Sequence, residues 1–468
     1  MLTILPRQIS MRAIIVYLLA LALVSLAFPA YAMNIGFVLM GCVWVIGFFM
    51  ATEFSTTSWR NRPEKYYIQH LFILALALRL IWVVFSYFYY IQLTGAPFEF
   101  DAADSVAYHS DAEWLAGQNW TTITDYLFSD RRMISDSGYL AYLTILYKIL
   151  GGSFIIPARI IKALLGSFTC VLIYKLASRI FDERVARMAG LMMAFMPNLI
   201  IYCGYHLKET EMLFLEVACL ERIDYLFRCK EFRIWNLLIP TLLAGSLFLF
   251  RTVLGAAAVL AFATGAILTS APNMKKNMRR LAIVGWGVLS LVVLSGGTIA
   301  TEVEGYWEQR DENVTRKRLQ QTIRGNQWAK YATGAVMAPM VVVLPFATMV
   351  DVDEQYGQQE KSGGNFIRNF MGFFAILAIY EALRQKKWRD FITIGAFVIA
   401  YLGVIATSGY SNSERFLLPA LPGLICMWAY GLSELRAKSY RLLTPWCVVV
   451  FLMQIAWAYF KLGSRGLF

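Results

Sequence analysis

The chain has 468 residues, of which 58% are hydrophobic and only 16% are charged, and its mean hydropathy is +0.54. Soluble domains usually carry about 25% charged residues, so this composition excludes a water-soluble globular protein and indicates a membrane protein in contact with a lipid bilayer. The net charge of +12 does not imply a nucleic-acid partner, because Lys and Arg gather in the cytoplasmic loops of membrane proteins.

The N-terminus combines basic residues with an apolar run over residues 13–28, followed by the small residues of AFPAYA. This order resembles a secretory signal peptide and its cleavage site. A second apolar run, residues 34–51, follows at once. We therefore expect a retained helical hairpin within residues 1–66.

Apolar runs predict an all-α polytopic membrane protein with about thirteen transmembrane helices. We expect these helices near residues 12–28, 34–51, 68–91, 157–180, 186–203, 209–227, 234–250, 252–270, 281–300, 366–383, 391–408, 416–434 and 442–461. Placing every short basic loop in the cytoplasm gives one consistent path with the N-terminus inside. The outer segments are then 92–156, 204–208, the turn at Arg251, 301–365 and 409–415.

Two outer loops are long enough to contain further elements. In the first, the apolar piece 139–150 is too short to span and predicts an interfacial or re-entrant helix. In the second, Pro339 and Pro345 interrupt the apolar piece 335–350, which we interpret as re-entrant. The expected divisions are an extra N-terminal hairpin (1–66), a catalytic-type module (67–300), the outer loop (301–365) and C-terminal transmembrane helices (366–468).

The positions of the cysteines argue against disulfide bonds and against a zinc site. The seven cysteines lie in or beside apolar segments, and no C-x-x-C pair occurs. We therefore expect neither a disulfide framework nor a zinc site.

The first outer loop places acidic residues next to a predicted helix over residues 105–115. Glu99, Asp101 and Asp104 crowd one short stretch, and Tyr108 shares a helical face with Ala112. Asp104 lies at the start of the helix, where a carboxylate is favoured by the free amides and the dipole. One interpretation of Asp104 is therefore a purely structural N-cap.

A second group of polar residues is expected at the same face. His206, Lys208 and Glu209 precede or open an apolar helix, and Arg251 and Arg415 lie at outer helix ends. Ionisable residues at the mouth of a membrane helix are functional candidates. A carboxylate can serve as a general base, and arginines can hold a phosphate by bidentate contacts.

These segments together resemble the GT-C superfamily of membrane glycosyltransferases, which use polyprenyl-phosphate-linked sugars. The superfamily includes protein O-mannosyltransferases and the aminoarabinose transferase of lipid A. Its first-loop pattern is matched here by Asp104, Tyr108, Ala112, Leu115, Gly117, Asn119 and Trp120. Its later Lys-acid pair resembles Lys208 and Glu209, and its Arg-aromatic-x-x-Pro-x-x-Pro helix start resembles ERFLLPALPG, with Arg415 at the Arg. The resemblance covers roughly residues 66–270 and 366–434.

The resemblance implies an inverting transfer on the extracytoplasmic side of the membrane. The lack of a disulfide framework and the compact loops favour the cytoplasmic (inner) membrane. In the family, the first-loop acid deprotonates the acceptor, which is a lipid, a glycan or a protein, and polyprenyl phosphate leaves. This implies Asp104 as the base, with Asp101 as a close rival because DAAD allows a shift in register. Ser105 departs from the family, which often has an acidic pair here.

The remaining candidates take supporting roles in the same resemblance. Glu209 corresponds to a second acid that arranges the site and in some members contacts a divalent metal, so a metal cofactor stays open. Lys208, Arg251 and Arg415 would neutralise the lipid phosphate.

Two of the three histidines, His109 and His206, flank these two motifs. Each could be a second base or a metal contact. Each could equally be a polar interface residue with a hydrogen-bond partner, and the sequence leaves these alternatives open.

Two other functions compete with this interpretation. A transporter or flippase of a lipid-linked sugar needs no catalytic carboxylate, but transporters usually bind near the bilayer midplane. A glycan polymerase or ligase would use outer-loop arginines in place of an Asp base. Polar clusters at helix ends and the Asp-x-x-x-Tyr-x-x-x-Ala pattern favour the glycosyltransferase.

Overall fold

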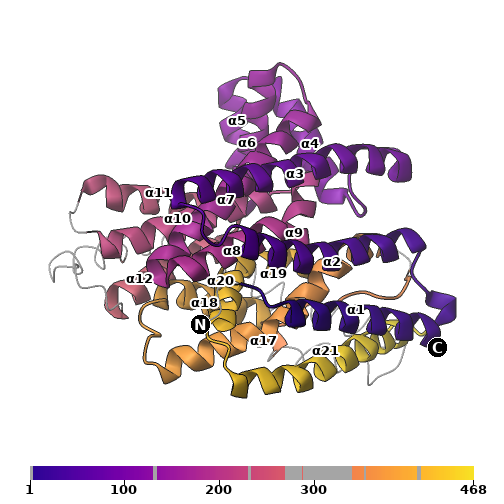
Figure 1. The fold of residues 1–468 in the computed structure, drawn as a ribbon. Helices are drawn as coiled ribbons and strands as arrows, with labels where there is room; N and C mark the ends of the chain where they lie inside the picture. Colours follow the sequence, from indigo (N-terminus) through magenta and orange to yellow (C-terminus); the bar gives the residue numbers. More distant parts are fainter. Residues whose placement is uncertain are drawn as a thin grey trace.

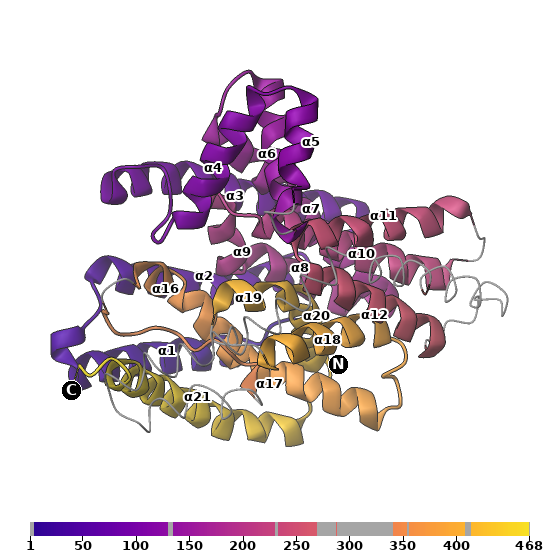
Figure 2. The same ribbon diagram turned by 180° about the vertical axis from the view of Figure 1, so that it is seen from behind.

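The structure, a computed structural model, describes residues 4–129, 134–229, 233–268, 287, 340–352, 355–407 and 413–467. Over these residues the regular structure is helical, and the one β-type pairing is an isolated bridge between Ala32 and Val350. The prediction of an all-α protein is therefore confirmed. Most of the long helices run side by side in one bundle (Figures 1 and 2).

Seven helices within the described ranges are long and apolar enough to cross a membrane. They are α1 (Arg7–Ala27), α2 (Ile35–Ser58), α3 (Glu64–Thr94), α7 (Ile155–Ile180), α17 (Ser362–Arg384), the unit Glu414–Ser433 and α21 (Ala437–Gly463). The unit Glu414–Ser433 consists of α19 (Glu414–Leu417), η4 (Leu418–Ala420) and α20 (Leu421–Ser433). All seven fall where the sequence predicts spans, and they define a multi-pass membrane protein.

An eighth candidate is a bent pair, α8 (Glu183–Phe195) and α9 (Pro197–Ile201), with the η2 turn (Tyr202–Gly204). The two helices meet at 54°. Pro197 lacks an amide hydrogen and disfavours helical geometry in the residue before it, and Met196 is accordingly extended (φ −64°, ψ 115°). The bend carries the chain into the segment that precedes α10 (Glu209–Arg228).

The predicted total of about thirteen spans is not confirmed. The apolar helices α11 (Ile234–Phe250), α12 (Thr252–Leu268) and α18 (Ile392–Thr407) have 17, 17 and 16 residues, close to the lower limit for a crossing. Helix α10 is buried along most of its length but carries several acidic residues. The basic loop at 275–280 and, apart from residue 287, the span predicted near 281–300 lie outside the described residues.

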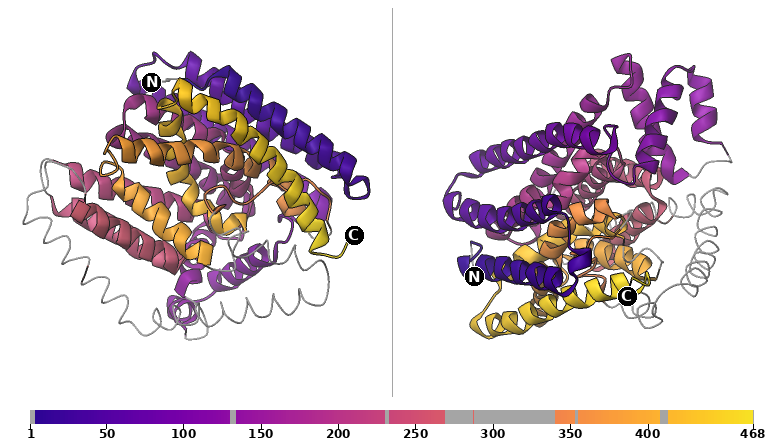
Figure 3. Two further views of the ribbon diagram at one scale, coloured as in Figure 1. Left: turned by 90° about the horizontal axis from the view of Figure 1, so that it is seen from below. Right: turned by 90° about the vertical axis from the view of Figure 1, so that its right-hand side faces the viewer.

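The predicted N-terminal hairpin packs against the rest of the bundle. Helix α1 lies along α21, and α2 packs on α8 and α17 (Figures 1 and 3). Tyr17 of α1 is fully buried, and its ring centroid lies 4.9 Å from that of Phe366 in α17. The hairpin therefore contributes directly to the hydrophobic core.

Helices α4 (Ala103–Ala116), α5 (Trp120–Leu127) and α6 (Ile134–Leu150) project from one side of the bundle (Figures 1 and 2). The helices predicted over 105–115 and 139–150 are thus confirmed. Lys148 of α6 donates hydrogen bonds of 3.1 and 2.7 Å to the carbonyl oxygens of Ala116 and Gln118. A lysine that satisfies the free carbonyls at a helix C-terminus ties α6 to α4.

The short basic loops pair with acids at one end of the helices. Arg179, in the last turn of α7, lies 2.8 Å from Glu221 and 3.2 Å from Asp224 of α10. Arg436, before α21, lies 3.9 Å from Glu434 at the end of α20. These ion pairs lie at the same end of the bundle, in agreement with the prediction that the described basic loops face one side of the membrane.

Residues 340–352 form a buried segment that passes between helices. The side-chain amide of Asn369 in α17 donates to the carbonyl oxygens of Val343 (2.6 Å) and Pro345 (2.8 Å). These bonds satisfy backbone acceptors that the segment could not pair by itself. The rest of the predicted re-entrant piece, residues 335–339, lies outside the described residues.

Candidate functional site

Asp104 of the first loop forms an ion pair with Arg415 of α19, between Oδ2 and Nη1. The N-cap of α4 is Ala102, and no side chain caps this helix. The interpretation of Asp104 as an N-cap is therefore wrong. Its carboxylate, 58% exposed, is held at the helix start by an arginine from the far C-terminal part of the chain and remains open to other molecules.

Glu209, at the first position of α10, is completely buried and faces two arginines. Its Oε1 pairs with Nε of Arg415 and lies 3.7 Å from Nη2 of Arg251. A buried carboxylate needs such partners to remain charged. Glu209 thereby connects the start of α10 to the break between α11 and α12 and to α19.

Arg251 occupies the break between α11 and α12, where its backbone is extended (φ −165°, ψ 115°). Its Nη1 donates a 3.1 Å hydrogen bond to Tyr401 Oη, which in turn donates to the carbonyl oxygen of Phe416 at 2.9 Å. The guanidinium also lies 4.7 Å from the centre of the Phe416 ring. These contacts hold Arg251 beside the helix start that carries Arg415.

Lys208 and Tyr108 meet on Asp136, an acid at the start of α6. Lys208 Nζ pairs with Asp136 and donates to the carbonyl oxygen of Ser135 at 2.9 Å. Tyr108 Oη donates to Asp136 Oδ1 at 2.8 Å. Burial favours the protonated acid, but Lys208, Tyr108 and Arg415 outweigh it and hold the pKa of Asp136 below its ordinary value. Asp136 is therefore an anion that joins the first-loop helix to the start of α10.

The two histidines are linked through one tyrosine. His109 Nδ1 lies 2.8 Å from Tyr147 Oη, which lies 2.9 Å from His206 Nε2. Burial, and then the cationic Lys162 and Arg159, lower the pKa of His206 well below 6.5. His206 is thus a neutral, fully buried residue with a hydrogen-bond partner.

Asp101 lies in a different environment from Asp104. Its backbone is left-handed (φ 59°), and its carboxylate approaches Gly357 of α16 (Tyr356–Glu360). Among the described residues no ion pair joins Asp101 to Arg251 or Arg415. The geometry favours Asp104 over Asp101 as the acid that accompanies the arginines.

The described residues contain no group of three or more His, Cys, Asp or Glu side chains arranged to hold a metal ion. Asp104 and Glu209 both pair with Arg415, so a guanidinium occupies the position between the two carboxylates. This arrangement does not fit a bound divalent cation.

Sequence reasoning missed a buried anchor directly beside Arg415. Glu414 accepts hydrogen bonds from Asn198 Nδ2 (2.7 Å) and Tyr202 Oη (2.6 Å), and it lies 3.8 Å from Lys361 Nζ. These partners come from α9, η2 and the residue before α17. The sequence motif singled out Arg415 as a candidate site residue. Its neighbour Glu414 holds in place the helix start from which Arg415 extends.

Asp136 and Tyr401 were also missed, for different reasons. Asp136 lies in the first turn of α6, three residues before the helix predicted over 139–150, so an acid at this position could have been included with the first-loop cluster. Tyr401 lies inside an apolar helix, and its contact with Arg251 gives no signal in the sequence.

Fold and site together define a class: a helical membrane protein that brings two carboxylates and two arginines from four distant segments together at helix ends. Residues 138–297 match the family model described as dolichyl-phosphate-mannose-protein mannosyltransferase. This match confirms the resemblance to the GT-C superfamily. The matched segment includes Glu209 and Arg251 but neither Asp104 nor Arg415.

Solved structures with similarity to the chain include oligosaccharyltransferases from Archaeoglobus fulgidus. One, tethered to an acceptor peptide containing the NVT sequon, has 11% identity and a TM-score of 0.47, with 87% of this chain and 56% of that chain covered. Another, AglB with an inhibitory peptide and a dolichol-phosphate, has 12% identity and a TM-score of 0.43, with 84% and 56% covered. The chain thus spans about 56% of the length of these proteins. Comparison with curated protein sequences gave no match.

Proposed function

We propose that this chain is an inverting glycosyltransferase that moves a sugar from a polyprenyl-phosphate donor to an acceptor at the extracytoplasmic face of the cytoplasmic membrane. The observation that carries the proposal is the convergence of Asp104 and Glu209 on Arg415, with Arg251 alongside. The description of the matched family, which names a dolichyl-phosphate-linked sugar, supports the donor class.

The reaction follows from the chemistry of these groups. Asp104 takes the proton from an acceptor hydroxyl or amine, and the acceptor atom forms a bond to the anomeric carbon of the sugar. The bond from that carbon to the phosphate oxygen breaks, and polyprenyl phosphate leaves with the electron pair. Because negative charge grows on the phosphate, cationic groups held beside it stabilise the transition state more than the ground state.

The positions of the cations support this proposal. Arg251 and Arg415 share the buried carboxylate of Glu209, which fixes both guanidinium groups. Arg415 also has planar geometry suited to bidentate binding of a phosphate. Lys208, held by Asp136, supplies a third positive charge on the adjacent helix start.

The test is a transfer assay with the purified chain and polyprenyl-phosphate mannose, measuring the release of polyprenyl phosphate. Asp104→Asn keeps the shape of the side chain but removes the base, and we expect a loss of at least about 100-fold. The matched control is Asp125→Asn, an exposed acid on α5, which should retain activity. An active Asp104→Asn together with an inactive Asp101→Asn would move the base to Asp101, and activity in both would reject a first-loop base.

A further inference from the structure

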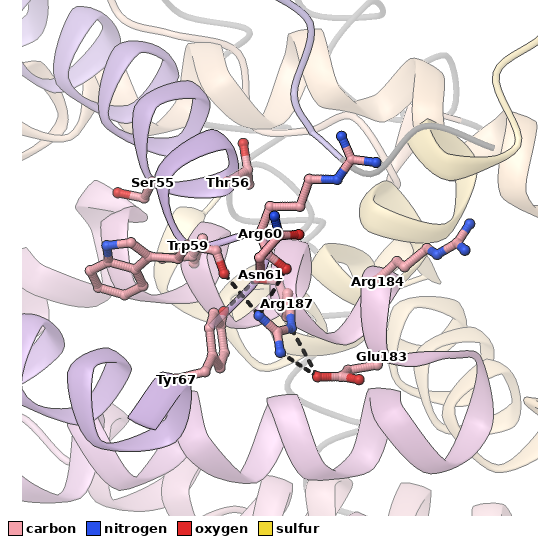
Figure 4. Close-up of a pocket in the computed structure, with 10 residues that line it drawn as sticks. Ser55, Thr56, Trp59, Arg60, Asn61, Tyr67, Glu183, Arg184 and Arg187 are labelled. Carbon is pink, nitrogen blue, oxygen red and sulfur yellow. Dashed lines mark hydrogen bonds and ion pairs between the residues drawn. The ribbon is translucent and has the colours of Figure 1, made fainter. Parts of the chain in front are cut away.

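A pocket lies at the start of α3, whereas Asp104 follows the other end of this helix (Figure 4 shows the pocket). It has a volume of about 420 Å³ and is enclosed by the end of α2, the start of α3 and the start of α8. The lining includes Trp59, Arg60, Asn61, Tyr67, Arg184 and Arg187. Helix α3 has 31 residues and so spans about 45 Å, with Tyr67 at the pocket end and the first outer loop after its other end.

Arg187 organises the loop that carries Arg60. It donates hydrogen bonds to the carbonyl oxygens of Trp59 (2.8 Å), Arg60 (3.2 Å) and Arg62 (2.6 Å). Its Nε also lies 3.0 Å from Glu183, which neutralises its charge. The pocket wall is therefore held in place without the help of a ligand.

The guanidinium groups of Arg60 and Arg184, in contrast, have no hydrogen-bond or ion-pair partner within the described part of the chain. Both are exposed and line the pocket, and Figure 4 shows their guanidinium groups extending away from Arg187, with no dashed line to any other side chain. A neighbouring guanidinium nitrogen, Nη1 of Arg62, is buried without a hydrogen-bond partner. Two uncompensated charges thus line one pocket. The unsatisfied donor lies on the adjoining loop, where the Arg62 guanidinium is 4.9 Å from the centre of the Trp59 ring.

The surroundings point to a lipid as the source of the anion. The pocket lies where two apolar helices end, so the level of the bilayer headgroups is expected here. Trp59 lies beside it, as is typical of the interface, and Phe54 of α2 is 70% exposed on the adjoining surface. The basic loops place this end of the bundle on the cytoplasmic side of the membrane. On that side, basic pockets between helices bind the headgroups of anionic lipids.

We propose that this pocket binds the phosphate-bearing headgroup of an anionic phospholipid from the cytoplasmic leaflet, with Arg60 and Arg184 as the phosphate ligands. The headgroup would enter from the side, with its acyl chains along the exposed apolar surface of α2. This site is separate from the proposed transfer reaction and does not depend on it.

The test uses the full chain in a neutral detergent, titrated with short-chain phosphatidylglycerol or phosphatidylcholine, with the thermal unfolding midpoint as the readout. We expect phosphatidylglycerol alone to raise the midpoint of the wild type. In the double variant Arg60→Gln and Arg184→Gln, the phosphatidylglycerol concentration that gives half of the maximal rise in the midpoint should increase at least about tenfold. The reason is that the charge-assisted hydrogen bonds from the two arginines to the lipid phosphate are lost. The two side chains have no partners to lose, so the midpoint without lipid should stay unchanged.

The matched control is the double variant Lys386→Gln and Arg389→Gln, which removes two exposed positive charges at the same end but outside the pocket. A general attraction of basic loops to anionic lipid predicts equal losses in both double variants, and that result would overturn the proposal. An unchanged response in the pocket variant would overturn it as well.

A parallel titration with inorganic phosphate and ATP distinguishes a lipid from a soluble ligand. Either compound could raise the unfolding midpoint in a way that depends on Arg60 and Arg184, while phosphatidylglycerol leaves it unchanged. That result would reject the lipid and assign the pocket to a soluble phosphate compound. A shift with phosphatidylglycerol alone supports the proposal as stated.

Discussion

Asp104 and Arg415, 311 positions apart in the chain, form an ion pair between Oδ2 and Nη1. The same guanidinium uses Nε to bind the buried Glu209. A guanidinium has five donor hydrogens, so Arg415 can keep Glu209 while a second anion competes with Asp104. A donor phosphate at this position would release the exposed carboxylate, and Asp104 would then be free to accept a proton from the acceptor.

We expect Arg415→Ala to weaken donor binding about 10- to 100-fold, because a charge-assisted contact to phosphate is lost. The measurement is a binding titration with polyprenyl phosphate. The control is Arg384→Ala, which removes an arginine that pairs with Glu381 at the opposite end of the bundle. Donor affinity should be unchanged there, and equal losses in the two variants would contradict the assigned position of the donor.

Glu414→Gln tests whether the anchor beside Arg415 controls its orientation. The substitution removes the charge that faces Lys361 and turns a buried acceptor into a donor towards Asn198 or Tyr202. We expect a stability loss of about 1–3 kcal/mol and a clear fall in donor affinity.

Glu434→Gln is the matched control for this prediction. Glu434 is also buried, accepts a 2.9 Å hydrogen bond from Gln385 and follows the other end of α20. It should lower thermal stability without changing affinity for polyprenyl phosphate. If both variants keep the donor affinity of the wild type, Glu414 has only a structural role.

Hydropathy predicted the described helices well because the cost of leaving backbone amides unpaired in lipid forces apolar runs into helices. The positions of α3, α7 and α21 follow directly from the apolar runs in the sequence. The resemblance to known transferases also identified Asp104, Glu209 and Arg415. It could not reveal that Arg415 bridges the two acids, since the first-loop segment and α19 are far apart in sequence and meet only through the packing of the whole bundle.

The same limit explains the residues that were missed. Asp136 and Glu414 act by pairing with a particular cation or hydroxyl from another segment, and composition carries no information on which segments become neighbours. The N-cap interpretation of Asp104 failed for a related reason. Local sequence predicts a cap at a helix start, but a tertiary ion pair with Arg415 took its place.

His206 should make stability depend on pH below neutrality. Its pKa is lowered in the folded protein by burial and then by Lys162 and Arg159, whereas the unfolded chain binds a proton near pH 6.5. The stabilisation is therefore fully present above pH 6.5 and is lost as the pH falls below it, at up to about 1.4 kcal/mol per pH unit.

Thermal unfolding at pH 7.5 and pH 5.5 checks this expectation. His206→Gln should lose part of the pH dependence, while His70→Gln, which changes an exposed residue of α3, should keep it. His109 contributes in the same direction, because its pKa is also lowered by burial, so some dependence should survive in His206→Gln. An identical pH dependence in wild type and His206→Gln would contradict the buried, neutral state of this side chain.

The contact between α17 and α20 gives the sharpest test of packing. A Cβ added at Gly431 would lie 2.0 Å from the backbone oxygen of Phe374, whereas one at Gly403 of α18 meets nothing within 4 Å. Backbone cannot move aside as a flexible side chain can, so Gly431→Ala must separate the two helices, at a cost of about 1–3 kcal/mol. Gly403→Ala adds a methyl group without a clash and should be neutral or slightly stabilising in a helix. Unfolding midpoints in detergent compare the two directly, and a Gly431→Ala protein as stable as Gly403→Ala would show that α17 and α20 are not in close backbone contact.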